Sequence, residues 1–197
     1  MHFPLIFKAV GNPEFGSEDL LAYEMGYRVK AHDRLTLDCS AFYNVYDNLW
    51  GAAVLPGELR LTPQPHLIIP GTNENILYGE SYGGEVSAVW QPLDSWRLRS
   101  GYSLLKLNLH TRGPIRSVTE DNEQFDSQQQ VFVWSDMDLG RQVEWGLGFR
   151  YVDDRRNLGI SDYTALESRL AWKPSANCEI ALIGRNILDP RHREAAR

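Results

Sequence analysis

Cysteine is scarce in this chain of 197 residues, and long apolar runs are absent. The two cysteines, Cys39 and Cys178, have neither CxxC spacing nor a histidine at metal-ligand spacing, so we interpret both as structural or incidental. The five histidines show no HxH or HxxxH spacing, and we expect no metal and no cofactor. No stretch approaches the roughly 18–20 consecutive apolar residues of a transmembrane helix.

Positive charge is also in deficit, because the net charge is -6. Nucleic-acid-binding proteins favour basic patches, so nucleic acid is not an expected partner. The composition, 43% hydrophobic and 23% charged, resembles that of a soluble protein. A membrane β-barrel would have the same composition, because its alternate residues face a polar lumen. The pattern along the chain must therefore decide between these two classes.

Segments of alternating apolar and polar residues recur along the chain. In residues 143–151 the odd positions are Val, Trp, Leu, Phe and Tyr, and the even positions are Glu, Gly, Gly and Arg. Similar alternation predicts strands at residues 21–29, 35–45, 82–90, 96–104 and 164–172, and less clearly at 131–139 and 178–186. About nine or ten residues is the length that a tilted strand needs to cross a bilayer. Strands of globular proteins average about five or six.

The predicted strands are joined alternately by short polar turns and by long connections. Short turns lie near Asp33, Asp94 and Ala176, and long connections are expected at about 47–78, 108–127 and 153–161. Short turns at one end and long loops at the other are typical of outer-membrane barrels. We therefore predict an all-β fold: an antiparallel, up-and-down transmembrane β-barrel, to which this chain contributes about eight strands.

Aromatic residues on the apolar side gather near the strand ends. The pattern predicts two lipid-interface girdles: Trp90, Trp96, Trp145 and Trp172 near the short turns, and Tyr43, Tyr82 and Tyr151 near the long connections. The alternative is that these rings form the core of a soluble β-sandwich that binds a ligand such as a carbohydrate. A sandwich would have a shorter apolar band and would dissolve without detergent.

The opposite side of the strands carries charges of both signs, which would pair across neighbouring strands in a wet lumen but would not be tolerated in a dry core. We assign these residues no catalytic role. Gly79-Glu80-Ser81-Tyr82-Gly83 matches the GxSxG elbow of α/β-hydrolases, and Asp162 and His192 follow in the order of a triad. That motif needs a helix after the serine, whereas residues 84–90 alternate as a strand. We therefore predict no catalytic residue and no enzyme.

The long connections hold the residues most suited to ligand contact. The candidates are Trp50, His66, His110, Arg112 and Arg116.

Four motifs resemble the β-barrel of TonB-dependent outer-membrane receptors. Residues 11–28 (GNPEFGSEDLLAYEMGYR) resemble the family's NP.L.PE…YE.GYR segment, and residues 38–49 (DCSAFYNVYDNL) resemble its AFYN.YDNL strand. Residues 79–85 (GESYGGE) and 184–189 (GRNILD) resemble its G.S.G.E strand and its near-terminal G.NLLD. The four motifs occur in the family's order and spacing.

The resemblance implies a 22-stranded barrel closed by a plug, which imports ferric siderophores, cobalamin or similar nutrients through the bacterial outer membrane. Residues 1–197 would be one piece, from the C-terminal part of that barrel, without the plug and the last strand. Residues 1–10 are too short and poorly arranged for a signal peptide, which also suggests a fragment. The implied partners are outer-membrane lipid and lipopolysaccharide, the rest of the barrel and plug, a ligand such as a ferric siderophore, and TonB through the N-terminal part.

Overall fold

The structure, a computed structural model, describes residues 4–113, 127–155 and 158–188. Every regular element in these residues is a β-strand. None of them forms a helix long and apolar enough to cross a membrane. The strands are β1 (Leu5–Val10), β2 (Asp19–His32), β3 (Leu35–Val54), β4 (Glu58–Arg60), β5 (His66–Leu93), β6 (Trp96–Thr111), β7 (Gln129–Asp138), β8 (Val143–Val152), β9 (Tyr163–Ser175) and β10 (Cys178–Gly184).

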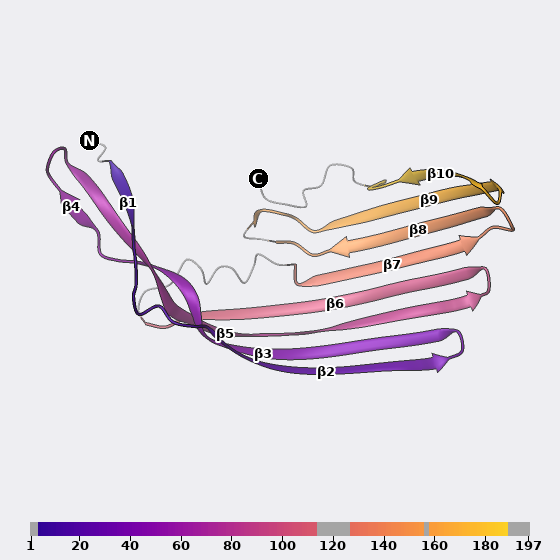
Figure 1. The fold of residues 1–197 in the computed structure, drawn as a ribbon, viewed down its shortest axis with the longest axis horizontal. Helices are drawn as coiled ribbons and strands as arrows, with labels where there is room; N and C mark the ends of the chain where they lie inside the picture. Colours follow the sequence, from indigo (N-terminus) through magenta and orange to yellow (C-terminus); the bar gives the residue numbers. More distant parts are fainter. Residues whose placement is uncertain (1–3, 114–126, 156–157, 189–197) are drawn as a thin grey trace. The chain divides into compact units, whose positions relative to one another are not determined.

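All ten strands belong to one sheet, with the order β10-β9-β8-β7-β6-β5-β3-β2, while β1 and β4 pair with β5 (Figure 1). The all-β, up-and-down prediction is confirmed. The sheet is open, with β2 and β10 at its two ends, as in part of a barrel. Because the described strands form one sheet rather than two packed sheets, the β-sandwich alternative is wrong.

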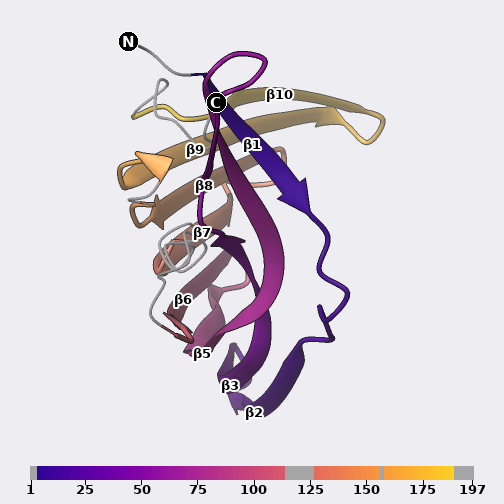
Figure 2. The same ribbon diagram turned by 90° about the vertical axis from the view of Figure 1, so that its left-hand side faces the viewer.

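The chain divides into two compact units, and β2, β3, β5 and β6 contribute to both. Unit 2 comprises residues 23–43, 82–106 and the described part of 124–197. Its short turns, β2–β3, β5–β6, β7–β8 and β9–β10, all lie at one end, on the right in Figure 1. Figure 2 shows its strands following one another in a curved wall. This arrangement places the turns where the sequence predicted them.

Unit 1 comprises the described part of residues 1–22, residues 44–81 and the described part of 107–123. Its centre is the first part of β5, which pairs with β4 in antiparallel fashion, Leu59 opposite Leu67. The strand β1 pairs with the same part of β5 in parallel fashion, Leu5 opposite Leu67. The N-terminal segment was not expected to form a strand, and this parallel pair departs from the predicted antiparallel pattern.

Strands extend into two of the predicted long connections. Most of residues 47–78 is strand, because β3 runs to Val54 and β5 begins at His66. Likewise β6 runs to Thr111, inside the connection predicted at 108–127. Each predicted strand ended where the alternation of apolar and polar residues stopped. Backbone hydrogen bonding continues beyond that point. Only the connection at 153–161 matches the expectation, closed by a bridge between Arg155 and Ile160.

The described chain has a small core. In unit 1 the buried apolar residues include Leu77 and Leu109, which are 2% and 7% exposed. In unit 2 a group forms where β8 and β9 meet the 153–161 connection: Val152, Ile160, Tyr163 and Ala165. Many other large apolar side chains are more than a third exposed, so the sheet does not stabilise itself by a buried core of the globular kind.

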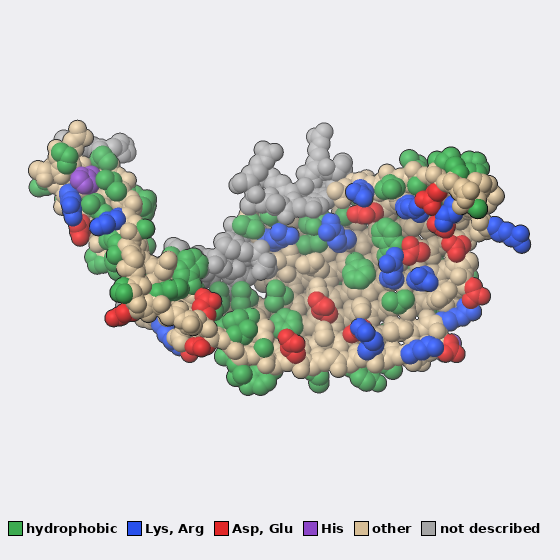
Figure 3. Space-filling view, in the orientation of Figure 1, with side chains coloured by type: hydrophobic (Ala, Val, Ile, Leu, Met, Phe, Trp, Pro, Cys, Tyr) green, Lys and Arg blue, Asp and Glu red, His purple; other side chains and the backbone are tan. Residues whose placement is uncertain are grey.

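Charged residues of both signs occupy one face of unit 2 (Figure 3). Ion pairs there connect neighbouring strands: Arg28 with Asp38, and Arg99 with Asp136 at 2.8 Å. We call this side the polar face of unit 2, and the other its apolar face.

Candidate functional site

The candidate ligand-contact residues lie in several parts of the chain. Trp50 is in β3, His66 begins β5, and His110 and Arg112 lie at the end of β6 and just after it. The structure brings His110 and Arg112 together but does not join His66 to them. Arg116 lies outside the described residues. Ligand contact by these residues stays a prediction.

Arg112 and His110 meet around the ring of Tyr78. The guanidinium carbon of Arg112 is 5.5 Å from the ring centroid, in cation–π geometry, and the His110 and Tyr78 centroids are 5.4 Å apart. The Nη1 group of Arg112 donates to the Asn48 side-chain oxygen at 3.0 Å, and Nη2 pairs with the Asp47 carboxylate. The arginine is thus held by a ring, a carboxylate and an amide, all in unit 1.

Asn48 is the central residue of an asparagine cluster that also contains Asn12, Asn73 and Asn75. It has a left-handed conformation, with φ of 54°, which asparagine tolerates better than most residues. Its Nδ2 donates to the Asp19 carboxylate at 2.8 Å, and its carbonyl accepts from Asn75 Nδ2 at 2.6 Å. The Gly16 N–H donates to Asn75 Oδ1 at 2.7 Å. These bonds fasten residues 16–19 to β3 and β5.

Trp50 takes part in the same group of hydrogen bonds. Its backbone N–H donates to Glu18 Oε1 at 2.7 Å, and its indole N–H donates to Asn73 Oδ1 at 2.9 Å. Asn12 donates to the Asn73 carbonyl at 3.0 Å. The polar atom of Trp50 is therefore engaged inside unit 1, and its ring, 42% exposed, is what remains for a ligand.

Sequence reasoning missed the asparagine cluster. The available signal was the Asn12-Pro13 step together with Asn73 and Asn75 at alternate positions, which a strand places on one side. Each asparagine joins segments that are distant in sequence, and no local pattern shows such a pairing.

His66 lies at the hairpin between β4 and β5, opposite Arg60. Its Nδ1 is 2.7 Å from the Gln64 carbonyl oxygen. This contact holds the imidazole against its own turn.

The register aligns two of the predicted girdle tryptophans in one row. Trp96 is opposite Met137, and Met137 is opposite Trp145. In the next row toward the β7–β8 turn, Trp172 lies between Val143 and Ile180. Trp90 and Trp172 are 47% and 49% exposed, on the apolar face.

Trp96 and Trp145 make the same hydrogen bond. The indole N–H of Trp96 donates to Ser135 Oγ, and that of Trp145 donates to Ser168 Oγ, each at 3.0 Å. In both cases the serine lies on the next strand, farther from the turn. Each pair satisfies two polar groups that would otherwise point out of the apolar face.

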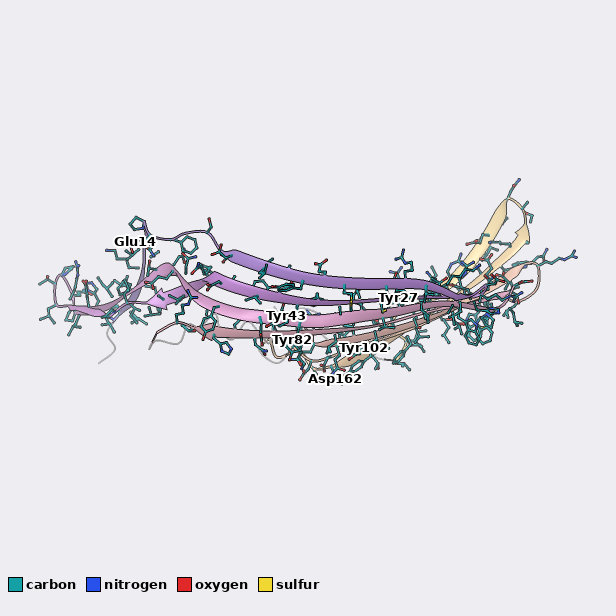
Figure 4. The ribbon with its side chains drawn as sticks, turned by 90° about the horizontal axis from the view of Figure 1, so that it is seen from below. Glu14, Tyr27, Tyr43, Tyr82, Tyr102 and Asp162 are labelled. Carbon is teal, nitrogen blue, oxygen red and sulfur yellow. The ribbon has the colours of Figure 1, made fainter. Side chains whose placement is uncertain are left out.

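Tyrosines mark the other end of the apolar face. Tyr43 and Tyr82 are each 41% exposed, and Tyr151 lies in one row with Val131 and Tyr102. Figure 4 shows Tyr43, Tyr82 and Tyr102 on β3, β5 and β6. Tyr102 and Tyr23 were not among the predicted girdle residues. The Tyr23 ring lies 6.5 Å from that of Tyr43. A lipid-interface role for these rings stays a prediction.

On the polar face, two aromatic rings lie over glycines of the next strand. A Cβ added at Gly101 would lie 2.3 Å from Phe132, and one added at Gly148 would lie 2.2 Å from the Trp134 ring. A shallow cavity of about 240 Å³ adjoins Phe132, with Glu85, Gln130 and Arg150 around it. The polar face thus offers flat aromatic surface beside charged groups.

The GxSxG segment lies inside β5 and does not form a nucleophile elbow. Ser81 is 3% exposed, and its hydroxyl lies 3.1 Å from Asn44 Nδ2 and 3.0 Å from the Tyr46 hydroxyl. A serine nucleophile needs an exposed hydroxyl at a strand-to-helix turn, so this motif carries no hydrolase chemistry.

Within residues 4–113, 127–155 and 158–188, no group of three or more His, Cys, Asp and Glu side chains could hold a metal ion. Cys39 and Cys178 are free and exposed.

Solved structures similar to this chain include receptors for ferric complexes and an iron transporter. The ferric-catecholate import receptor Fiu of E. coli K12 has a TM-score of 0.65 at 16% identity, over 92% of this chain and 25% of its own. The FrpB iron transporter of Neisseria meningitidis has a TM-score of 0.66 at 15% identity, over 97% and 31%. The ferric yersiniabactin receptor FyuA of Yersinia pestis has a TM-score of 0.64 at 18% identity, over 89% and 26%.

These likenesses show the fold, and this chain spans about a quarter to a third of those proteins' lengths. No curated protein sequence matches the chain significantly. The sequence does match a family described as TonB dependent receptor-like, beta-barrel, over residues 4–187. Receptors of this family are transporters of the outer membrane rather than enzymes. The chain therefore belongs to the TonB-dependent receptor β-barrel family.

Proposed function

We propose that this chain forms part of the barrel wall of an outer-membrane receptor that imports a scarce nutrient, such as a ferric siderophore. Its apolar face would contact lipid and its polar face would line the lumen. The observation that carries this proposal is the concentration of large, exposed apolar side chains on one face of unit 2. Met25 and Leu182 are 75% and 74% exposed, and the ion pairs lie on the opposite side.

An exposed apolar surface of this extent is unfavourable in water, because each square ångström costs about 25 cal/mol. In a bilayer the same surface meets hydrocarbon, and the penalty disappears. From Trp96 to Leu104, β6 advances about 26 Å at about 3.3 Å per residue. Tilted by about 40°, that segment spans about 20 Å, close to the roughly 25 Å apolar band of outer-membrane barrels.

Two observations support a ferric chelate as the ligand class. Fiu and FyuA are named as receptors for ferric complexes, and the aromatic and charged groups of the polar face suit a large polar chelate. The plug and TonB are the protein partners that the family implies. The predicted ligand-contact residues are Trp50, His66, His110, Arg112 and Arg116.

The first test is whether the chain needs a membrane. We expect it to be insoluble in plain buffer, and to refold into detergent or lipid vesicles with β-type circular dichroism. A monomeric chain that melts cooperatively in buffer without detergent would refute the proposal.

The ligand is tested in living cells with a variant of the receptor Fiu in which residues 4–187 of this chain replace the corresponding part of the barrel wall. We expect the exchanged receptor to import iron from ferric chelates and not to import cobalamin. Import of cobalamin with no import of iron would contradict the siderophore assignment, while leaving the membrane assignment intact.

A further inference from the structure

The polar face of unit 2 contains a hollow between two aromatic side chains of β7. In one row, Phe132 lies between Gly101 of β6 and Arg150 of β8. In the next row toward the β7–β8 turn, Trp134 lies opposite Gly148 of β8. The Phe132 ring covers Gly101 and so leans toward β6, whereas the Trp134 ring leans toward β8. Because the two rings lean in opposite directions, they leave space between them.

A cavity of about 150 Å³ lies in this space, among β7, β8 and β9. Gly148 and Ala165 are the small residues of its lining, and Arg150 and Glu167 are the charged ones. An apolar cavity of about 150 Å³ holds one benzene ring. The hollow therefore has the size of a single six-membered aromatic ring.

Phe132 presents an apolar surface where no lipid covers it. The side chain is 47% exposed and lies beside Arg150 on the polar face. This step rests on the proposed function, in which the polar face lines the lumen. Removing such a ring from water by contact with another apolar group is favourable. The exposed ring thus favours a ligand that brings an apolar surface of its own.

The Trp134 ring is held in place by the polar face itself. Its indole N–H donates to Asp136 Oδ1 at 2.6 Å, and Arg99 Nη2 donates to Asp136 Oδ2 at 2.8 Å. A surface that is already ordered loses less conformational freedom when a ligand binds. Trp134 therefore offers the hollow a preorganised aromatic wall.

The charged groups lie at two ends of the hollow. The guanidinium carbon of Arg150 is 5.5 Å from the ring centroid of Tyr163, which is only 7% exposed and supports the arginine from one side. Glu167 lies opposite Gly148, two residues nearer the β7–β8 turn than Arg150. Two residues of a strand span about 6.6 Å. An anionic group and a hydroxyl at opposite ends of one ring would match this separation.

We propose that the hollow binds a free hydroxylated aryl acid of one ring, such as 4-hydroxybenzoate. Its ring stacks on Trp134 and contacts Phe132, in the offset or edge-on arrangements that aromatic pairs prefer. Its carboxylate pairs with Arg150, whose planar donor fork suits that group, and its hydroxyl donates to Glu167. A hollow of one-ring size does not admit a whole ferric chelate, so this ligand is additional to the chelate proposed above.

The test titrates 4-hydroxybenzoate into the full chain refolded in detergent, followed by ligand-observed NMR. Arg150→Gln removes the cation, and we expect the Kd to rise about tenfold, as for one lost charge-assisted contact. Arg28→Gln is the matched control, because Arg28 is also an exposed arginine of the polar face, paired with Asp38, but does not line the hollow. Its Kd should equal that of wild type. Equal Kd values for wild type and Arg150→Gln would overturn the proposal.

Two ligand analogues test the same contacts without any variant. Methyl 4-hydroxybenzoate keeps the ring and the hydroxyl but has no charge, and it should bind wild type about tenfold more weakly than the acid. 4-Hydroxycyclohexanecarboxylate keeps both polar groups but lacks the flat ring, and it should bind several-fold more weakly. An ester that binds as tightly as the acid would overturn the proposal.

Failure of this inference is distinguishable from failure of the proposed function. A chain that is folded in detergent, with β-type circular dichroism, but binds no aryl acid would overturn this inference alone. A chain that folds in plain buffer would contradict the membrane assignment, whether or not it binds the acid.

Discussion

The close fit of Trp134 over Gly148 gives the sharpest test of the packing on the polar face. A methyl group added by Gly148→Ala would lie 2.2 Å from two carbons of the Trp134 ring. Carbon atoms pack at about 3.5–4.0 Å, so the ring must leave its position. Moving it also breaks the hydrogen bond from the Trp134 indole N–H to Asp136, which is 2.6 Å long.

The expected magnitude combines two opposing effects. Replacing glycine by alanine inside a strand favours folding by about 0.5–1 kcal/mol, because glycine loses more backbone entropy. Overpacking costs about 1–3 kcal/mol, which outweighs that gain. We therefore expect Gly148→Ala to lower the free energy of unfolding by about 1–2 kcal/mol. Gly26→Ala is the control, because its added methyl group meets nothing closer than 3.8 Å, and it should be neutral or slightly stabilising.

The assay is urea unfolding of the chain refolded in detergent, followed by tryptophan fluorescence. Removing the ring with Trp134→Ala should abolish the effect of a second substitution at Gly148. If Gly148→Ala unfolds at the same urea concentration as wild type, with unchanged fluorescence, the packing argument is refuted.

Three further predictions concern single contacts. Trp145→Phe and Ser168→Ala should each lower the free energy of unfolding in urea. Because each removes the same hydrogen bond, the loss in the double variant should be smaller than the sum of the two single losses by about 0.5–1.5 kcal/mol. Full additivity would contradict the pairing. Asn48→Ala and Asn48→Gly both remove the side-chain hydrogen bonds, but only glycine adopts the left-handed backbone without strain. Proteolysis of residues 11–18 should therefore be faster in Asn48→Ala than in Asn48→Gly. Equal rates would show that the backbone conformation contributes nothing. Lys173→Met removes one of the two cations paired with Glu144, the other being Arg169, and should lower the urea concentration of half-unfolding only slightly, and less at high salt, because these groups are partly exposed; a change unaffected by salt would argue against an electrostatic origin.

Alternation alone was enough to predict the strands of unit 2 and their turns. Residues 143–151 lie within β8 (Val143–Val152) almost as predicted, because a sheet with one apolar and one polar face imposes period two over its whole length. The tryptophan positions followed from the same argument, and the register then aligned Trp96 with Trp145.

The predicted ends of several strands were wrong for a physical reason. The prediction assumed that apolar residues stay on one side of a strand. On β6 they change sides after Leu104, although the strand continues to Thr111. The parallel pairing of β1 could not be predicted either, because it depends on a partner segment distant in sequence. The same holds for Asn48, whose partners come from β2, β5 and the residue just after β6.

The parallel placement of β1 has a consequence for the order of assembly. Asn12, just after β1, bonds to Asn73, 61 residues away, whereas Arg28 and Asp38 of the β2–β3 hairpin are 10 apart. Closing the longer loop costs about 1.6 kcal/mol more in chain entropy. The hairpins should therefore form before β1 can attach. Although β1 precedes its partner in synthesis, it should be the last part of unit 1 to join, because the segment of β5 with which it pairs is made after it.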